Sequence, residues 1–171
     1  MTGRPGGKAA AAVAVVIALG CPANASADCG PPSSGPSTID GLFAEIPGFT
    51  VGQGCPAIAS PFTGADVKAA TAHEITRDGN SVVTVFASEL ASGSGQAFID
   101  ETFLPAAQGT ASEAQTVGPY RVTYFNISHF SDGYAYADGP TVVIGYDTAW
   151  PQTRGAVREV FPTLLARISP A

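Results

Sequence analysis

The order of polar and apolar residues repeats in two stretches sixty positions apart. Each stretch begins with Asp-Gly, continues through one residue to a small hydroxyl side chain and two valines, and has an aromatic ring at its ninth position; they span residues 78–86 and 138–146. Asp-Gly is a favoured two-residue hairpin turn because both central positions take positive φ. The pattern therefore predicts two hairpin turns, each leading into a strand.

The strand predicted after the first turn is apolar on both faces. Side chains alternate along a strand, so Val83 and Val85 share one face while Val82 and Phe86 share the other. A strand with two apolar faces is typical of the centre of a sheet. Further strand-like runs lie at residues 71–77, 113–117, 120–126 and 134–137.

Each hairpin is followed by a stretch with helical periodicity. Residues 96–107 place Phe98, Ile99 and Phe103 on one side of a helix. The last stretch carries apolar residues at steps of 3, 4, 7, 8 and 11, and Pro162 inside it predicts a kink. This stripe consists of Val157, Val160, Phe161, Leu164, Leu165 and Ile168. A shorter helix is predicted at residues 39–46.

These elements predict an α+β fold. Hairpins favour antiparallel pairing, so we expect a single antiparallel twisted sheet of about five strands with two long helices packed on one face. The two similar pieces suggest an internal hairpin-helix repeat with pseudo-twofold symmetry. The alternative is a chance match, because turn-plus-strand signals of this kind are common.

Residues 1–27 have the pattern of a secretory signal peptide. Arg4 and Lys8 supply a positive start, residues 9–20 are an unbroken apolar run, and residues 25–27 form a small-x-small cleavage site. The apolar run is shorter than the roughly 20 residues needed to span a bilayer. We expect cleavage before Asp28 and no transmembrane helix in the mature chain.

A second interpretation of the same region is a lipid anchor. Residues 18–21 resemble the bacterial lipobox, in which Cys21 would become the lipidated first residue. The match is imperfect because Ala18 stands where Leu is usual. In either case residues 28–37 form a flexible leader rich in Pro, Ser and Gly, and residues 38–171 form a single globular domain.

The remaining cysteines predict a disulfide. Once Cys21 is removed or lipidated, Cys29 and Cys55 are a single pair in an oxidising compartment. Their bond would close a loop of about 26 residues and stabilise the domain by ~3 kcal/mol. A redox pair would need close spacing and a zinc site four ligands, so we interpret the pair as structural and expect no metal.

The charge balance argues against nucleic acid as a partner. The chain has a net charge of -6, and without Arg4 and Lys8 it keeps six basic residues against fourteen acidic ones, a net charge near -8. Such a surface repels phosphate backbones and anionic lipid. The sequence also contains no phosphate-binding loop or dinucleotide fingerprint, so we expect no cofactor.

Motifs for hydrolysis are weak. Residues 128–132 contain Ser, His and Asp, but neighbours in a strand or turn cannot converge as a catalytic triad does. His73 and His129 are interpreted as hydrogen-bonded side chains, either on the surface or partly buried, rather than as ligands or bases. The contrasting hypothesis is a secreted hydrolase or hydrolase inhibitor, which would place one of these histidines beside an acid or a hydroxyl in a deep pocket.

Aromatic residues with a polar atom are concentrated in one region. All five tyrosines and the only tryptophan lie between residues 120 and 150, and we take five of these as candidate ligand-binding residues: Tyr120, Tyr124, Tyr134, Tyr136 and Trp150. On a helix-free sheet face they would suit a protein, peptide or saccharide ligand. The alternative is that they only line a half-buried sheet. The leading hypothesis is a non-enzymatic secreted or cell-envelope binding module of bacterial origin, located outside the cytoplasm.

Overall fold

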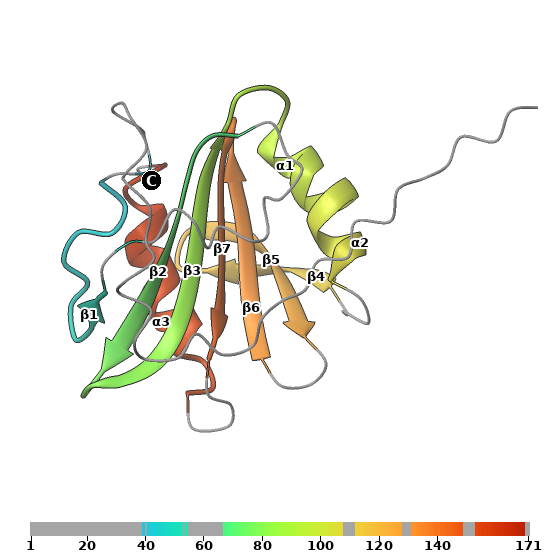
Figure 1. Ribbon diagram of the computed structural model, residues 1–171. Helices are drawn as coiled ribbons and strands as arrows, with labels where there is room; N and C mark the ends of the chain where they lie inside the picture. Colours follow the sequence, from blue (N-terminus) through green and yellow to red (C-terminus); the bar gives the residue numbers. More distant parts are fainter. Residues whose placement is uncertain are drawn as a thin grey trace, which may run out of the picture.

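The computed structural model describes residues 39, 41–52, 54, 67–107, 112–127, 131–148 and 153–169. Within them the chain forms one seven-stranded sheet in the order β1-β2-β3-β7-β6-β5-β4, and every neighbouring pair is antiparallel (Figure 1). The strands are β1 (Thr50–Val51), β2 (Val67–Arg77), β3 (Asn80–Leu90), β4 (Ser112–Val117), β5 (Tyr120–Ile127), β6 (Ser131–Asp138) and β7 (Thr141–Asp147).

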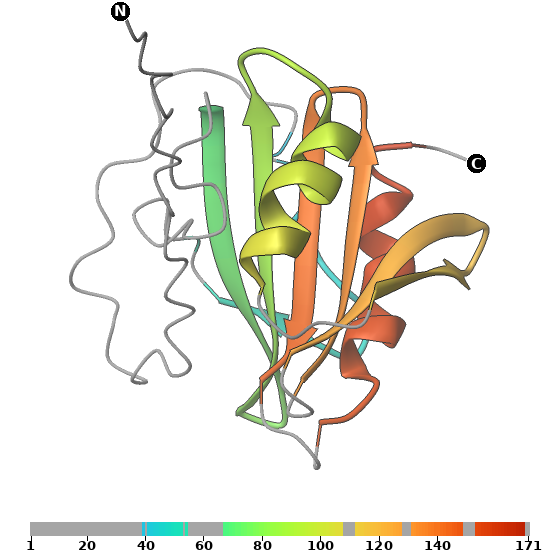
Figure 2. The same cartoon turned by 90° about the vertical axis from the view of Figure 1, so that its right-hand side faces the viewer.

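Helices cover both faces of this sheet. The stretch after β3 consists of α1 (Gly95–Phe98), the π-helical turn η4 (Ile99–Phe103) and α2 (Leu104–Ala106), and the chain ends with α3 (Ala156–Leu165). Figures 1 and 2 show α1 and α2 on one side of the strands and α3 on the other. The sheet is therefore the middle of three layers.

The predicted arrangement of about five strands with two long helices on one face is wrong. The sheet has seven strands, α3 has ten residues, and the helical stretch after β3 is divided into three short pieces on the opposite face from α3. The physical reason is the burial of the central strands, since all seven residues of β7 are buried. A strand that is apolar on both faces must be covered on both.

The strand parts of the two similar units are related by a local twofold axis. At the centre of the sheet β3 pairs with β7, and the pairs are Thr84 with Tyr146, Val85 with Gly145 and Phe86 with Ile144. Corresponding positions of the two units are sixty residues apart. Val85 therefore pairs with its own counterpart, Gly145, while Thr84 pairs with the counterpart of Phe86 and Phe86 pairs with the counterpart of Thr84. The helices do not follow this symmetry. A twofold axis perpendicular to the sheet would place both helices on the same face, whereas they lie on opposite faces.

Two apolar clusters fill the spaces between the layers. The cluster beneath α3 contains Val83 and Val85 of β3, Val143 of β7, and Val157, Phe161 and Leu164 of α3. The cluster beneath α1 and α2 contains Phe86 of β3, Val142 and Ile144 of β7, and Phe98, Ile99 and Phe103 of the helical stretch.

The segment before the sheet forms turns in place of the predicted helix at residues 39–46. Ile39, Leu42 and Ile46 are nevertheless buried in the α3-side cluster. The Arg167 guanidinium, just after α3, donates hydrogen bonds to the carbonyls of Leu42, Ala44 and Glu45. We call residues 41–52 and 54 the N-terminal arm; they include β1 and lie along the β2 edge of the sheet.

One buried hydroxyl has no hydrogen-bond partner in the described part of the chain. Ser88 of β3 is fully buried, and no acceptor or donor lies within reach of its Oγ. A buried hydroxyl without a partner costs roughly 1–3 kcal/mol. We therefore expect Ser88→Ala to raise the free energy of unfolding by about 1 kcal/mol in urea denaturation, a rare gain for a core substitution.

The matched control for Ser88→Ala is Ser81→Ala on the same strand. The Ser81 hydroxyl lies 3.2 Å from the Thr148 hydroxyl, so its removal breaks a hydrogen bond and should lower stability by about 0.5–1 kcal/mol. Equal losses for both variants would contradict the packing described around Ser88.

Candidate functional site

Four of the candidate tyrosines lie on the sheet face covered by α3. Tyr120 and Tyr134 are buried in the α3-side cluster, and Tyr124 and Tyr136 are half-buried against it. The Tyr124 and Tyr134 rings are 5.8 Å apart, and Tyr120 meets Tyr136 edge to face at 6.0 Å. Trp150 lies outside the described residues.

The tyrosine hypothesis required a helix-free sheet face, but α3 covers the face that carries these four tyrosines. The Tyr134 ring packs 5.7 Å from that of Phe161 in α3, and its hydroxyl donates to Gln115 Oε1 at 3.3 Å. Tyr120 and Tyr134 could therefore meet a ligand only if α3 moved. Tyr124 and Tyr136 keep part of their surface, and ligand binding by these two remains a prediction.

Asp132 organises the polar groups beside these tyrosines. Its carboxylate accepts hydrogen bonds from the Tyr124 hydroxyl at 2.6 Å, Asn126 Nδ2 at 3.0 Å and Arg154 Nε at 3.2 Å. Burial alone would raise the pKa of Asp132, but these three donors outweigh it and lower the pKa. Burial and the bond to Asp132 raise the pKa of Tyr124 to about 12, so its phenol stays neutral.

A second buried carboxylate, Asp147, holds the start of α3. It ends β7 and accepts hydrogen bonds from the backbone N–H of Gly155 at 2.7 Å and of Val157 at 2.8 Å. These bonds satisfy N–H groups that a helix start leaves unpaired. Burial raises the pKa of Asp147 to about 6, although the two backbone bonds oppose the shift. Its role is structural, since it fixes α3 to the sheet.

His73, in the middle of β2, contacts the N-terminal arm at two points and one residue of its own strand. Its ring stacks on Phe43 with centroids 3.8 Å apart, its Nδ1 lies 2.9 Å from the Gly52 carbonyl, and its Nε2 lies 3.2 Å from the Thr71 hydroxyl. The contrasting hydrolase hypothesis expected a histidine beside a hydroxyl, and His73 has one. The ring is covered, however: a Cβ placed at Gly54 would lie 2.6 Å from its Nε2. No substrate atom can approach Nε2 from that side.

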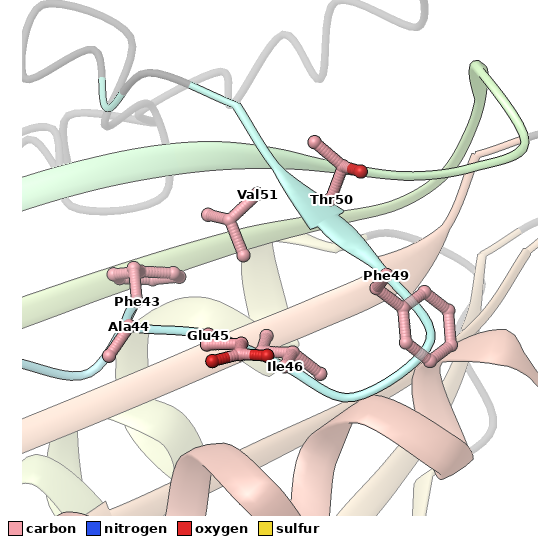
Figure 3. Close-up of a pocket in the computed structure, with 7 residues that line it drawn as sticks. All are labelled: Phe43, Ala44, Glu45, Ile46, Phe49, Thr50 and Val51. Carbon is pink, nitrogen blue, oxygen red and sulfur yellow. The ribbon is translucent and has the colours of Figure 1, made fainter.

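An open hollow lies beside His73, in the bend of the N-terminal arm. Its volume is about 350 Å³, and Figure 3 shows its lining side chains along a U-shaped stretch of chain that ends in β1. The lining mixes apolar side chains with polar atoms, which include those of Thr50 and Glu45. The lining residues are Phe43, Ala44, Glu45, Ile46, Phe49, Thr50 and Val51.

The hollow is braced from outside. The Arg77 guanidinium lies 4.3 Å from the centre of the Phe49 ring, a cation–π contact, and it also pairs with Glu159 of α3 at 2.5 Å. Phe43 rests on His73, and Arg167 bonds three carbonyls of the preceding turn. The two partly exposed phenylalanines are therefore held in place by the sheet and by α3.

The pattern of the sequence did not predict this hollow. A short helix was predicted at residues 39–46, and a helix there does not bring Phe43 and Phe49 together. The available signal was the presence of two phenylalanines within seven residues, either side of Pro47-Gly48. Large apolar residues flanking a turn outside a strand or helix have no regular core face to occupy.

Several predicted sites fall outside the described residues. These are the signal peptide at 1–27, the leader at 28–37, Cys21, Cys29, Cys55 and His129. Among the described residues, every helix is too short or too polar to cross a bilayer, and nowhere do three His, Cys, Asp or Glu side chains gather closely enough to hold a metal ion.

Comparison with known proteins adds no relative: no family model, no curated protein and no solved structure matches this chain.

Proposed function

We propose that the protein is an exported, non-enzymatic binding module whose ligand-binding surface is the hollow of the N-terminal arm. The single observation that carries the proposal is a braced surface hollow of about 350 Å³ that is open to solvent and lined in part by partly exposed aromatic side chains. It is an open hollow, whereas small-ligand pockets enclose most of their ligand. It suits one bulky side chain rather than a whole cofactor.

The chemistry of the hollow favours an extended peptide segment of a partner protein. Phe43, Phe49 and Val51 are partly exposed and offer contact to an apolar side chain, and exposed Glu45 with the chain's net charge of -6 favours a neighbouring basic residue. Aromatic residues that keep part of their surface exposed are enriched at the centre of interfaces. The segment we propose carries Phe or Leu beside Lys or Arg.

A pair of synthetic peptides tests this assignment. A nine-residue peptide with a central Phe flanked by lysines should bind, whereas the same peptide with flanking glutamates should bind more weakly. Phe49→Ala should lower the affinity of the lysine peptide by about tenfold or more, as loss of an aromatic contact at an interface does. Isothermal titration calorimetry measures all three affinities.

The control variant is Leu104→Ala, which removes a partly buried apolar side chain from α2 on the opposite face. It should leave peptide affinity unchanged. Equal affinity for both peptides, or equal losses for Phe49→Ala and Leu104→Ala, would contradict the assignment.

Export is supported by the pattern of residues 1–27. Cleavage before Asp28 and lipidation at Cys21 would give mature proteins of different mass. If the signal is cleaved before Asp28 and Cys29 pairs with Cys55, intact mass spectrometry of the exported protein should give a chain beginning at Asp28 with two hydrogens fewer than its formula. A lipid adduct on Cys21 would instead indicate an envelope lipoprotein and overturn the cleavage prediction.

A further inference from the structure

Strand β4 ends the sheet and turns one row of backbone groups outward. It stands last in the strand order, and among the described residues it pairs only with β5 (Figure 1). Val117 and Tyr120 flank a two-residue turn, so they form a hydrogen-bonded pair. Hydrogen-bonded and non-bonded pairs alternate along an antiparallel ladder, so every second residue of β4 directs its N–H and C=O away from β5. These outward residues are Ser112, Ala114 and Thr116.

Of the two edges of the sheet, β1 is protected and β4 is not. β1 has only two residues, and a very short edge strand is one way in which natural sheets avoid pairing with other chains. β4 has six residues, contains neither proline nor lysine, and pairs with β5 in an unbroken register without a bulge. Ser112, Glu113, Ala114 and Thr116 are exposed. Such an edge favours pairing with a further strand.

The side chains of β4 complement a second copy of the same strand in one antiparallel register. With a twofold axis at Ala114, this residue faces its own copy, and Ser112 faces Thr116. Every outward N–H of one strand then meets an outward C=O of the other. Glu113 lies opposite Gln115 of the other copy, where the amide can donate a hydrogen bond to the carboxylate. The pairing is therefore self-complementary.

The neighbouring registers fit less well. An axis at Glu113 places two carboxylates opposite each other, and like charges directly opposite destabilise a sheet. It also pairs Thr116 with a position beyond the end of β4. An axis at Gln115 leaves Ser112 beyond the other strand and sets Glu113 opposite the apolar Val117. Only the register centred on Ala114 uses the whole strand without opposing like charges.

We propose that two copies of the protein pair through β4 and form one continuous antiparallel sheet across a twofold axis at Ala114. The interface is isologous, since the same strand contributes from both copies. The hollow of the N-terminal arm lies at the opposite edge of the sheet and includes both residues of β1, so pairing leaves it free. A dimer would hold a partner with two copies of the proposed peptide segment more tightly than a partner with one, and this consequence alone rests on the proposed function.

Sedimentation equilibrium of the exported protein, from micromolar to millimolar concentration, tests the pairing without any ligand. The wild type should pass from monomer to dimer. Ala114→Pro removes an N–H that points away from β5 and places a ring at the twofold axis. Edge strands tolerate proline at such positions, so its urea denaturation should stay close to that of the wild type. Its dimer dissociation constant should rise by at least about tenfold.

Charge variants at residue 115 test the register. Gln115→Lys places a positive charge opposite Glu113 at two symmetric points, so the dissociation constant should fall by about fivefold, and Gln115→Glu should raise it by a similar factor. The matched control is Gln96→Lys, the same substitution on the exposed surface of α1. It changes the net charge equally but lies outside β4, so it should leave the dissociation constant close to that of the wild type.

The proposal is overturned if the wild type stays monomeric at millimolar concentration or if Ala114→Pro dimerises as the wild type does. Equal effects of Gln96→Lys and Gln115→Lys would also overturn it. Should Ala114→Pro fail to fold, the opposite effects expected of the two variants at residue 115 still decide the matter. Because no peptide takes part, failure of the peptides to bind would sink the proposed function and leave these results unaffected.

Discussion

Phe161→Ala should lower the free energy of unfolding by about 3–5 kcal/mol, the cost of deleting a fully buried aromatic side chain. Phe161 lies at the centre of the α3-side cluster, where it meets Tyr134 and the backbone of Gly145. Because small domains are stable by only about 5–15 kcal/mol, this variant should be partly unfolded under conditions the wild type tolerates. Urea denaturation at a fixed pH measures the difference.

A mutant cycle tests the contact itself. A Cβ at Gly145 would lie 2.9 Å from Phe161 Cε2, so Gly145→Ala should cost about 1–3 kcal/mol in the wild type and clearly less with Phe161→Leu, whose side chain leaves that space. Gly133→Ala is the control, since its Cβ would meet Phe125 on the other face. Its cost should not depend on residue 161. If the losses in the free energy of unfolding caused by Gly145→Ala and Phe161→Leu were simply additive, the described packing of α3 on β7 would be contradicted.

The second large effect concerns pH. Asp147 has a pKa of about 6 in the folded protein against 3.8 for an ordinary aspartate, so the folded state holds this proton more tightly than the unfolded chain. The stability gained from protonation is fully present below about pH 4 and is lost as the pH rises through 6. The loss amounts to about 3 kcal/mol, at 1.36 kcal/mol per unit of pKa.

The comparison with Asp147→Asn isolates this group. Asparagine carries no charge and can still accept one of the two bonds from Gly155 and Val157. The stability of the wild type minus that of Asp147→Asn should therefore fall by about 3 kcal/mol between pH 4 and pH 7. The lowered pKa of Asp132 acts in the opposite direction, but it is common to both proteins and largely cancels. Parallel pH profiles would rule out a raised pKa for Asp147.

The hairpins were the most predictable part of the fold, because turn residues are local. Asp78 and Gly79 are the two central residues of the first turn, with φ of 52° and 77°. The second turn differs: Asp138 pairs with Thr141, so Gly139 and Pro140 are central and only Gly139, at φ 55°, needs the left-handed region. The sequence Asp-Gly-Pro is compatible with a turn centred on Asp138-Gly139 and with one centred on Gly139-Pro140, and only the strand register decides between them.

Register also explains why one face assignment failed. Strict alternation predicted that Val82 lies on the other face of the sheet from Val83 and Val85, yet all three belong to the α3-side cluster. The pairing jumps from Ile75 with Val83 to Thr76 with Ser81, so β3 contains one extra residue at this point. A bulge of this kind interrupts the two-residue period and leaves no clear mark in the sequence.

The faces chosen by the helices required information from several strands. The apolar residues on both faces of β3 already indicated cover on both sides, but the predicted fold placed both long helices on one face of the sheet. In the structure the helix after β3 covers Val142 and Ile144, and the helix after β7 covers Val143. Alternation along β7 therefore determines which helix each residue meets. The arm could not be predicted, because its contacts with His73 and Arg167 join residues far apart in the chain.

The central claim, that ligand binds in the hollow of the arm, is tested most directly by titrating the ¹⁵N-labelled exported protein with the lysine-flanked Phe peptide at pH 7.5. The account predicts that the largest amide shifts fall on Phe43, Phe49 and Val51 and are absent from β4 and β5. Shifts centred on Tyr124 and Tyr136, or no shifts at millimolar peptide, would contradict it.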